Sequence, residues 1–221
     1  MKKLYLKIRY QLIPSVIHVL RKRYYQKCRK KLKNQTPTII ASDCFGGMAY
    51  HNLGLKFRSP TINLCFLHDE FPVFVQNLRG YLAAELVRVD DPSVSYPVGE
   101  LEYDGRRVRI HFMHYKSFDE AKEKWNERKQ RVDYSNIYIV QTVPAATEEK
   151  IRAFDALPYG NKMLITGKNL TNSKNVCTHP VFLKDGYRPG EFLEYKSDFS
   201  LKRYMDEIDY VGFLNRPKGN V

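Results

Sequence analysis

The hydrophobic positions of this chain follow a helical period near the N-terminus and then alternate between short apolar runs and further helical patterns. Runs rich in β-branched residues and bounded by turn residues predict buried strands, and apolar residues three or four positions apart predict amphipathic helices. Strands are expected at 38–42, 61–66, 85–89, 106–113, 136–142 and 162–166. Helices are expected at 48–53, 69–82, 117–131, 147–157 and 200–215. This alternation is typical of an α/β fold with a mainly parallel sheet flanked by helices.

One pair of segments predicts an antiparallel insertion in that sheet. The segment 106–113 alternates strictly between apolar and polar positions, as a strand with one buried face does. It follows Asp104-Gly105, a pair that favours the tight turn of a β-hairpin. We therefore expect a hairpin beside the parallel strands.

An amphipathic helix is expected within residues 1–34, ahead of the body. Pro14 interrupts its pattern, so we expect a kink or a restart near Ile13. An apolar face flanked by lysine and arginine suits a helix on an anionic membrane surface; the alternatives are packing on the body and contact with nucleic acid. The chain divides into a basic helical arm (1–34) and a single α/β domain (35–221). The apolar face consists of Leu6, Tyr10, Ile13, Ile17, Leu20 and Tyr24.

Positive charge is concentrated in this arm. The 221-residue chain has 37 Lys and Arg against 24 Asp and Glu, a net charge of +13, and 12 of the bases and none of the acids lie in residues 1–34. The remainder is therefore nearly neutral. This distribution argues against a protein that coats nucleic acid with its whole surface. It favours a neutral domain that carries a separate basic segment.

The chain shows neither an export signal nor a disulfide framework. The apolar run at 12–20 is followed at once by Arg21-Lys22-Arg23 and lacks a small-x-small cleavage site, so we expect no processed signal. No apolar stretch is long enough for a transmembrane helix. The four cysteines are widely spaced, which predicts neither a zinc site nor disulfides. We expect a cytoplasmic protein held peripherally on the inner face of the plasma membrane.

The first candidate site is the connection that follows the strand at 38–42. Cys44, Gly46 and Gly47 lie there, and paired glycines at a helix N-terminus let backbone amides approach an anion such as a donor phosphate. The alternative is a tight turn that needs glycine dihedral angles. Cys44 is a candidate nucleophile, because a cysteine at a helix N-terminus can have a depressed pKa, or it is a small buried residue.

Histidines supply the second candidate. His114 and Tyr115 follow the strand at 106–113, at what would be the functional edge of an α/β sheet, so His114 is a candidate general base and Tyr115 a substrate contact. His114 as a capping or core residue is the alternative. His51 follows the glycine turn and would face the same cleft. His111 and His114 lie three apart on a strand and point to opposite faces, so we assign no metal site.

Three charged residues complete the set. Asp69 follows the expected strand 61–66, where it would contact substrate, hold a metal or cap the next helix. Arg128 and Arg131 are candidate phosphate ligands, although the C-terminal end of a helix favours positive charge in any case.

Several segments together resemble the bacterial domain-of-unknown-function family numbered 1919, over about residues 37–215. The segments are 39–47, 53–55 with 59–61, 96–99, 114–121 with Lys124-Trp125 and 128–131, and 209–215. Ser42-Asp43 departs from the Asn-rich pair expected before the cysteine. Members of this family are often labelled exopolysaccharide biosynthesis proteins or acetyltransferases. The resemblance therefore implies surface-polysaccharide synthesis, without fixing a reaction.

The resemblance and the arm together predict a transferase that acts on a lipid-linked glycan at the cytoplasmic membrane face. Acyl transfer from acetyl-CoA to a sugar hydroxyl is slightly favoured, with His114 as base, the Cys44–Gly47 turn on the donor phosphates, and Arg128 or Arg131 on donor or carrier phosphate. A nucleotide-sugar glycosyltransferase is one alternative. A non-enzymatic scaffold or regulator of the polysaccharide machinery is the other. Expected partners are the anionic membrane and other polysaccharide-assembly enzymes, not nucleic acid.

Overall fold

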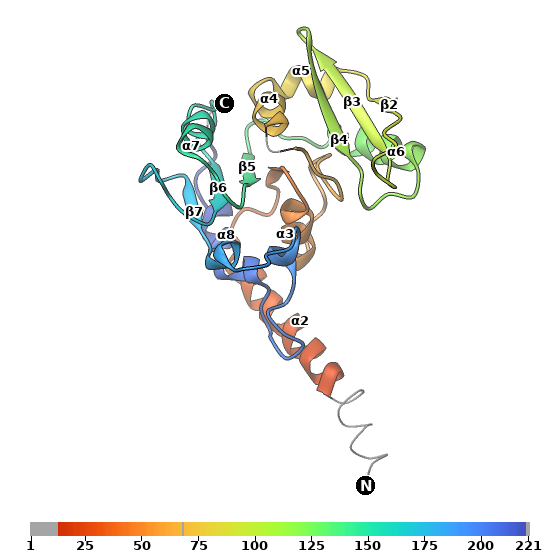
Figure 1. The fold of residues 1–221 in the computed structure, drawn as a ribbon. Coiled ribbons are helices and arrows are strands. Elements are labelled where there is room, and N and C mark those ends of the chain that lie inside the picture. The colour runs from red at the N-terminus through yellow and green to blue at the C-terminus, as the bar shows by residue number, and fades with distance from the viewer. Residues whose placement is uncertain (1–12, 68, 220–221) are drawn as a thin grey trace.

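The computed structural model describes residues 13–67 and 69–219 and shows an α/β fold in three layers (Figure 1). The middle layer is a parallel sheet in the order β1-β5-β6-β7. Its strands are β1 (Thr38–Ala41), β5 (Ile137–Thr142), β6 (Lys162–Thr166) and β7 (Val176–Thr178). Each strand is added beside the previous one, so the sheet grows in a single direction and the order of these strands never reverses.

Alternating side chains divide the core between the two faces of this sheet. Ile39 and Ala41 of β1 lie on one face with Tyr138 and Val140 of β5, whereas Ile40 lies on the other. Because successive strand residues point to opposite faces, a strand buried on both sides is apolar throughout. This explains why β1 and β5 read as continuous apolar runs.

Helices and the second sheet cover these faces. The Ile39 face is covered by α3 (Phe45–Leu53), α8 (Tyr210–Leu214) and three short 3₁₀ segments, η2 (Pro180–Leu183), η3 (Glu191–Leu193) and η4 (Tyr204–Glu207). The Ile40 face is covered by α4 (Glu70–Gln76), α5 (Leu78–Ala83), α6 (Phe118–Lys129) and α7 (Glu148–Asp155). The antiparallel sheet contributes Leu101, Val108 and Ile110 to the same core.

The predicted hairpin is confirmed. Strands β2 (Val87–Val89), β3 (Val98–Tyr103) and β4 (Arg106–His111) form an antiparallel sheet, separate from the parallel one. Asp104 and Gly105 both have positive φ angles, 52° and 69°, as a two-residue hairpin turn that matches the strand twist requires.

Three expected elements differ from the structure. The helix expected at 69–82 is interrupted at Asn77 and forms α4 and α5. Residues 61–66 form no strand apart from a bridge between Cys65 and His111, because Asn63 takes a left-handed conformation (φ 62°) that interrupts the extended run. The terminal helix expected at 200–215 is broken into η4 and α8. The Asp209 side chain accepts a hydrogen bond from the Gly212 amide at 2.8 Å and so starts a new helix there.

The arm helix α2 (Ile13–Lys31) extends away from the body toward the N-terminus (Figure 1). Pro14 is the second described residue of α2, so the kink or restart expected near Ile13 falls at the edge of the described residues, and Leu6 and Tyr10 lie outside them. The middle of α2 is fastened to the body: Tyr25 donates to Asp206 at 2.7 Å, and the Arg21 Nε donates to the Ser200 carbonyl at 2.9 Å. Among the described residues, no helix combines the length and apolarity that crossing a bilayer requires.

Candidate functional site

Helix packing explains the first glycine of the pair after β1 but not the second. Gly46 and Gly47 are both buried within α3. A Cβ atom on Gly46 would lie 3.0 Å from the Ala41 Cβ and 3.4 Å from Ile39 Cγ2, so Gly46 lets α3 approach β1 closely. Gly47 has more room, with its nearest contact at 3.5 Å from Ile62 Cγ2. Neither glycine has a positive φ angle, so the turn does not need them for left-handed backbone.

Cys44 precedes α3 but lacks the electrostatics of a nucleophile. Burial, with smaller contributions from the nearby Asp43 and Cys65, raises the pKa of its thiol to about 12. A nucleophilic cysteine needs the opposite shift, because the thiolate is the reactive form. Cys44 therefore stays a protonated thiol at neutral pH.

His114 does not lie at the edge of the parallel sheet. It is exposed in the turn after β4, and β4 belongs to the antiparallel sheet. The expectation failed because the alternating pattern of 106–113 is the same for a strand of either sheet. The carboxyl ends of the parallel strands are where α/β folds gather their functional groups, and His114 is on another element.

The loop after α3 is held by a set of hydrogen bonds that involves three side chains, those of Tyr115, Arg128 and Arg131. The Tyr115 hydroxyl donates to the Ile62 carbonyl at 3.0 Å and accepts from Arg128 Nη1 at 2.6 Å. Arg131 Nη1 donates to the Phe57 carbonyl at 3.1 Å, and its Nη2 pairs with Glu127. These contacts give all three side chains a structural role.

Asp69 is exposed and pairs with Lys150 of α7 at 2.8 Å. It stands at the N-cap position of α4, but its side chain makes no capping hydrogen bond. Residues 13–67 and 69–219 contain no group of three or more His, Cys, Asp or Glu side chains placed to hold a metal ion.

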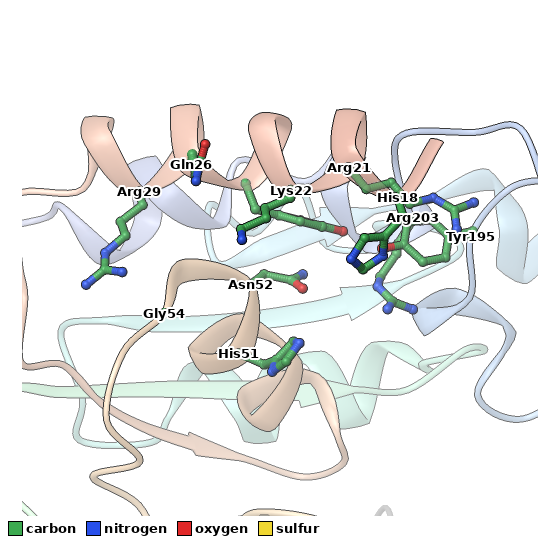
Figure 2. Close-up of a pocket in the computed structure, with 11 residues that line it drawn as sticks. His18, Arg21, Lys22, Gln26, Arg29, His51, Asn52, Gly54, Tyr195 and Arg203 are labelled. Atoms are coloured by element: carbon green, nitrogen blue, oxygen red, sulfur yellow. The ribbon is translucent and has the colours of Figure 1, made fainter. Parts of the chain in front are cut away.

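His51 is the predicted site residue that lines a strongly charged cavity. This cavity has a volume of about 440 Å³ and lies between α2, α3 and the segment 195–203 (Figure 2). We call this cavity the basic pocket. Its lining consists of His18, Arg21, Lys22, Tyr25, Gln26, Arg29, His51, Asn52, Gly54, Tyr195 and Arg203.

The lining of the basic pocket carries positive charge and no acid. Arg21, Lys22, Arg29 and Arg203 supply four permanent positive charges. By contrast, a cavity of about 690 Å³ beside the antiparallel sheet mixes Arg88 and Lys116 with acids. Four cations with no acid in the lining repel one another, and a bound anion would relieve that repulsion.

Tyr195 lies between two of these cations. The guanidinium carbon of Arg21 is 3.5 Å from the centre of the Tyr195 ring, and that of Arg203 is 4.1 Å from it. A ring face attracts cations through its quadrupole, so Tyr195 holds both side chains in place. Arg203 also donates through Nη1 to the Leu193 carbonyl at 2.7 Å, whereas its buried Nε has no hydrogen-bond partner among the described residues.

Asn52 contributes a second unsatisfied donor. Its side chain is 7% exposed and lies in the gap between α2 and α3 (Figure 2). The amide is near enough to the Tyr210 hydroxyl to affect its pKa, but Nδ2 completes no hydrogen bond of normal geometry within the described residues. A buried donor without a partner costs free energy, so Asn52 would gain from an acceptor that reached Nδ2 from the pocket.

The carboxyl group of Asp206, beneath α2, is hydrogen-bonded to three neighbouring groups. Asp206 accepts hydrogen bonds from the Tyr25 hydroxyl at 2.7 Å, the Tyr210 hydroxyl at 3.2 Å and the Arg203 amide at 2.8 Å. Burial raises the pKa of this carboxyl above its usual range. Its oxygens are thus engaged in the contact beneath α2, and its charge also interacts with that of Arg203 at one end of the pocket.

Sequence reasoning found the arm and His51 but missed Asn52, Tyr195 and Arg203. Asn52 reads as an ordinary helix residue, and the other two lie in a segment expected to be loop or helix. The signal available in the sequence was the excess of lysine and arginine in the arm without any acid, which indicates an anionic partner.

Comparison with known families identifies the chain. A family model described as "Domain of unknown function (DUF1919)" matches residues 16–215. An uncharacterized protein of Haemophilus influenzae is 35% identical over 209 residues, which cover 93% of this chain and 98% of that protein. The chain belongs to the DUF1919 family, as its sequence resemblance indicated. The match begins at Val16, so it includes most of α2, which the resemblance over 37–215 had left out.

Proposed function

We propose that this protein is a transferase of surface-polysaccharide synthesis that works on a lipid-linked glycan at the inner face of the plasma membrane. The observation that carries this proposal is the position of α2. Its N-terminal end extends from the body, and the stretch from His18 to Arg29 forms one wall of the basic pocket (Figures 1 and 2). A substrate whose phosphates lie at a membrane surface would meet both features together.

The outer face of α2 suits an anionic bilayer. With 3.6 residues per turn, one side of the helix carries the pocket residues His18, Lys22, Tyr25 and Arg29, and the opposite side carries Val16, Leu20, Arg23 and Lys27. Val16 is 56% exposed and Val19 47% exposed. Apolar side chains at the extended end followed by cations match the order of acyl chains and anionic headgroups.

The chemistry we propose is direct transfer to a sugar hydroxyl. The high thiol pKa of Cys44 argues against an acyl-enzyme on that residue. In the acyl case the sugar oxygen bonds to the acetyl carbon of acetyl-CoA, the thioester C–S bond breaks, and the hydroxyl proton passes to a base. His51 is better placed for this role than His114, because it lies in the basic pocket. The glycosyl case uses a nucleotide sugar, with the nucleotide diphosphate as leaving group.

A transfer assay with the full chain tests this proposal. Vesicles that carry a lipid-linked glycan are incubated with acetyl-CoA or with a nucleotide sugar, and the mass of the glycan is measured. A gain of an acetyl or sugar group that falls in His51→Ala and persists in His114→Ala supports the proposal. A chain that binds the vesicles but modifies no glycan with either donor would instead fit a scaffold or regulator of the assembly enzymes.

A further inference from the structure

We propose that the basic pocket is a diphosphate-binding site. The inference deepens the proposed function by naming the group that is recognised, and the naming of a lipid-linked source rests on that function. Diphosphate binding itself needs neither a membrane nor a transfer reaction. The proposal depends on three properties of the pocket: its charge, its unsatisfied donors and its size.

The charge of the pocket selects a multivalent anion. Arg21, Lys22, Arg29 and Arg203 line it without an acid. A single carboxylate would leave most of this charge uncompensated, whereas a diphosphate brings two or three negative charges on one compact group. Arginine is suited to this task because its planar donors match phosphate oxygens in pairs.

The unsatisfied groups are all donors. Asn52 Nδ2 and Arg203 Nε are buried and lack partners within the described chain, and Lys22 and Arg29 form no ion pair there. A ligand that satisfies them must present acceptors. Phosphate oxygens are acceptors that also carry the negative charge that the four cations favour.

The pocket is larger than one phosphate group needs. A volume of about 440 Å³ falls within the usual range for small-molecule sites, roughly 300–1,000 Å³. It leaves room for two phosphoryl groups and the start of the moiety attached to them. Two sources share this chemistry: the diphosphate of a lipid carrier and the diphosphate of a nucleotide donor.

The arm is part of the site, so ligand and arm are coupled. One wall of the pocket is α2, and the opposite walls are α3 and the segment 195–203. A diphosphate that bridges Arg21 and Lys22 to Asn52 would add contacts between α2 and the body. Bound ligand should therefore slow hydrogen exchange in α2, because it binds only the docked arrangement.

Calorimetric titration of the full chain with inorganic pyrophosphate tests the proposal. Lys22→Gln removes a pocket charge, and Lys27→Gln removes the same charge from the opposite face of α2. Both side chains are exposed and neither is needed for packing. We expect Lys22→Gln to weaken binding by about tenfold, the loss of one charged hydrogen bond, and Lys27→Gln to leave it nearly unchanged. Asn52→Asp adds a negative charge beside the pocket and should abolish binding; because this side chain is buried, its unfolding temperature is measured alongside, and the lysine pair decides the outcome if the variant does not fold.

The outcomes separate the pocket from general electrostatics. No measurable pyrophosphate binding, or equal weakening by both lysine variants, would overturn the proposal, as would tighter binding of an RNA oligonucleotide that both variants weaken equally. If only Lys22→Gln weakens pyrophosphate binding, a nucleoside diphosphate and a polyprenyl diphosphate in micelles are then compared on the same chain. Tighter binding of either one, with the same dependence on Lys22, supports the site and assigns its source. Pyrophosphate binding in a chain that transfers nothing would refute the proposed function and leave this site standing.

Discussion

The guanidinium group of Arg21 lies 3.5 Å above the ring of Tyr195, which joins the arm helix to the segment 195–203. Arg21 also donates to the carbonyls of Ser200 and Asp198, each at 2.9 Å. One side chain of the arm therefore fixes a loop that is distant in sequence. The arm is thus built into one wall of the basic pocket, and α2 carries no fully buried residue that could dock it by apolar packing alone.

Tyr195→Leu should loosen the arm without unfolding the body. The substitution keeps an apolar contact but removes the ring that holds Arg21 and Arg203, a loss of about 0.5–2 kcal/mol. We expect faster hydrogen exchange in α2 and unchanged exchange in β5 and β6. Equal acceleration in the arm and the sheet strands would show instead that Tyr195 supports the whole fold.

The two glycines of α3 should respond oppositely to alanine. Gly46→Ala places a Cβ 3.0 Å from the Ala41 Cβ, and overpacking of this kind costs about 1–3 kcal/mol. Gly47→Ala meets its nearest atom at 3.5 Å and gains helix propensity of about 1 kcal/mol. Urea unfolding measures both. If both variants kept wild-type stability but lost pyrophosphate binding, the glycines would instead be part of a phosphate-binding site.

Cys44 should be unreactive and should make the fold sensitive to alkali. Its folded pKa of about 12 exceeds the ordinary thiol value of 9.0, so the unfolded chain releases this proton first as pH rises. Its contribution to stability is complete below about pH 9 and is lost progressively toward pH 12. Cys44→Ala should therefore lose less stability than the wild type between these values. At pH 8, Cys44 should react with iodoacetamide far more slowly than in the unfolded chain, and rapid labelling of native protein would contradict this account.

Tyr115→Phe should destabilise the loop after α3. It removes the donor to the Ile62 carbonyl at 3.0 Å and the acceptor of Arg128 at 2.6 Å, which together contribute about 1–3 kcal/mol. Pyrophosphate binding should be unchanged, because none of these groups lines the basic pocket. A selective loss of binding at wild-type stability would return Tyr115 and Arg128 to the binding site.

The exposed face of α2 should control membrane association. Val16→Asp combined with Leu20→Asp places acids where the extended helix would enter an anionic bilayer. We expect the wild type to sediment with vesicles that contain phosphatidylglycerol and the double variant to stay in solution. Val87→Asp is the control, since Val87 is about as exposed (55%) but lies on the antiparallel sheet. Equal binding of wild type and double variant would exclude this face.

The strands β1, β5 and β6 and the hairpin turn were predictable from local pattern, whereas β7 and the site were not. The apolar runs at Ile39-Ile40 and 137–142 and the turn Asp104-Gly105 each depend on neighbouring residues, so one sequence reveals them. The strand prediction at 61–66 was wrong because an apolar, β-branched run does not reveal that Asn63 takes a left-handed conformation. The basic pocket needs Arg21, Asn52 and Arg203 together, and only the tertiary fold brings α2, α3 and the segment before η4 to one place. The predicted position of His114, after β4, was wrong for a similar reason: the alternation of apolar and polar residues does not show which sheet a strand joins.

The most direct test of the central claim is a crystal structure of the full chain with bound pyrophosphate. We predict density for the two phosphoryl groups between α2 and α3, within hydrogen-bond distance of Asn52 Nδ2 and Arg203 Nε. Pyrophosphate bound instead at the turn formed by Cys44, Gly46 and Gly47 would contradict this account.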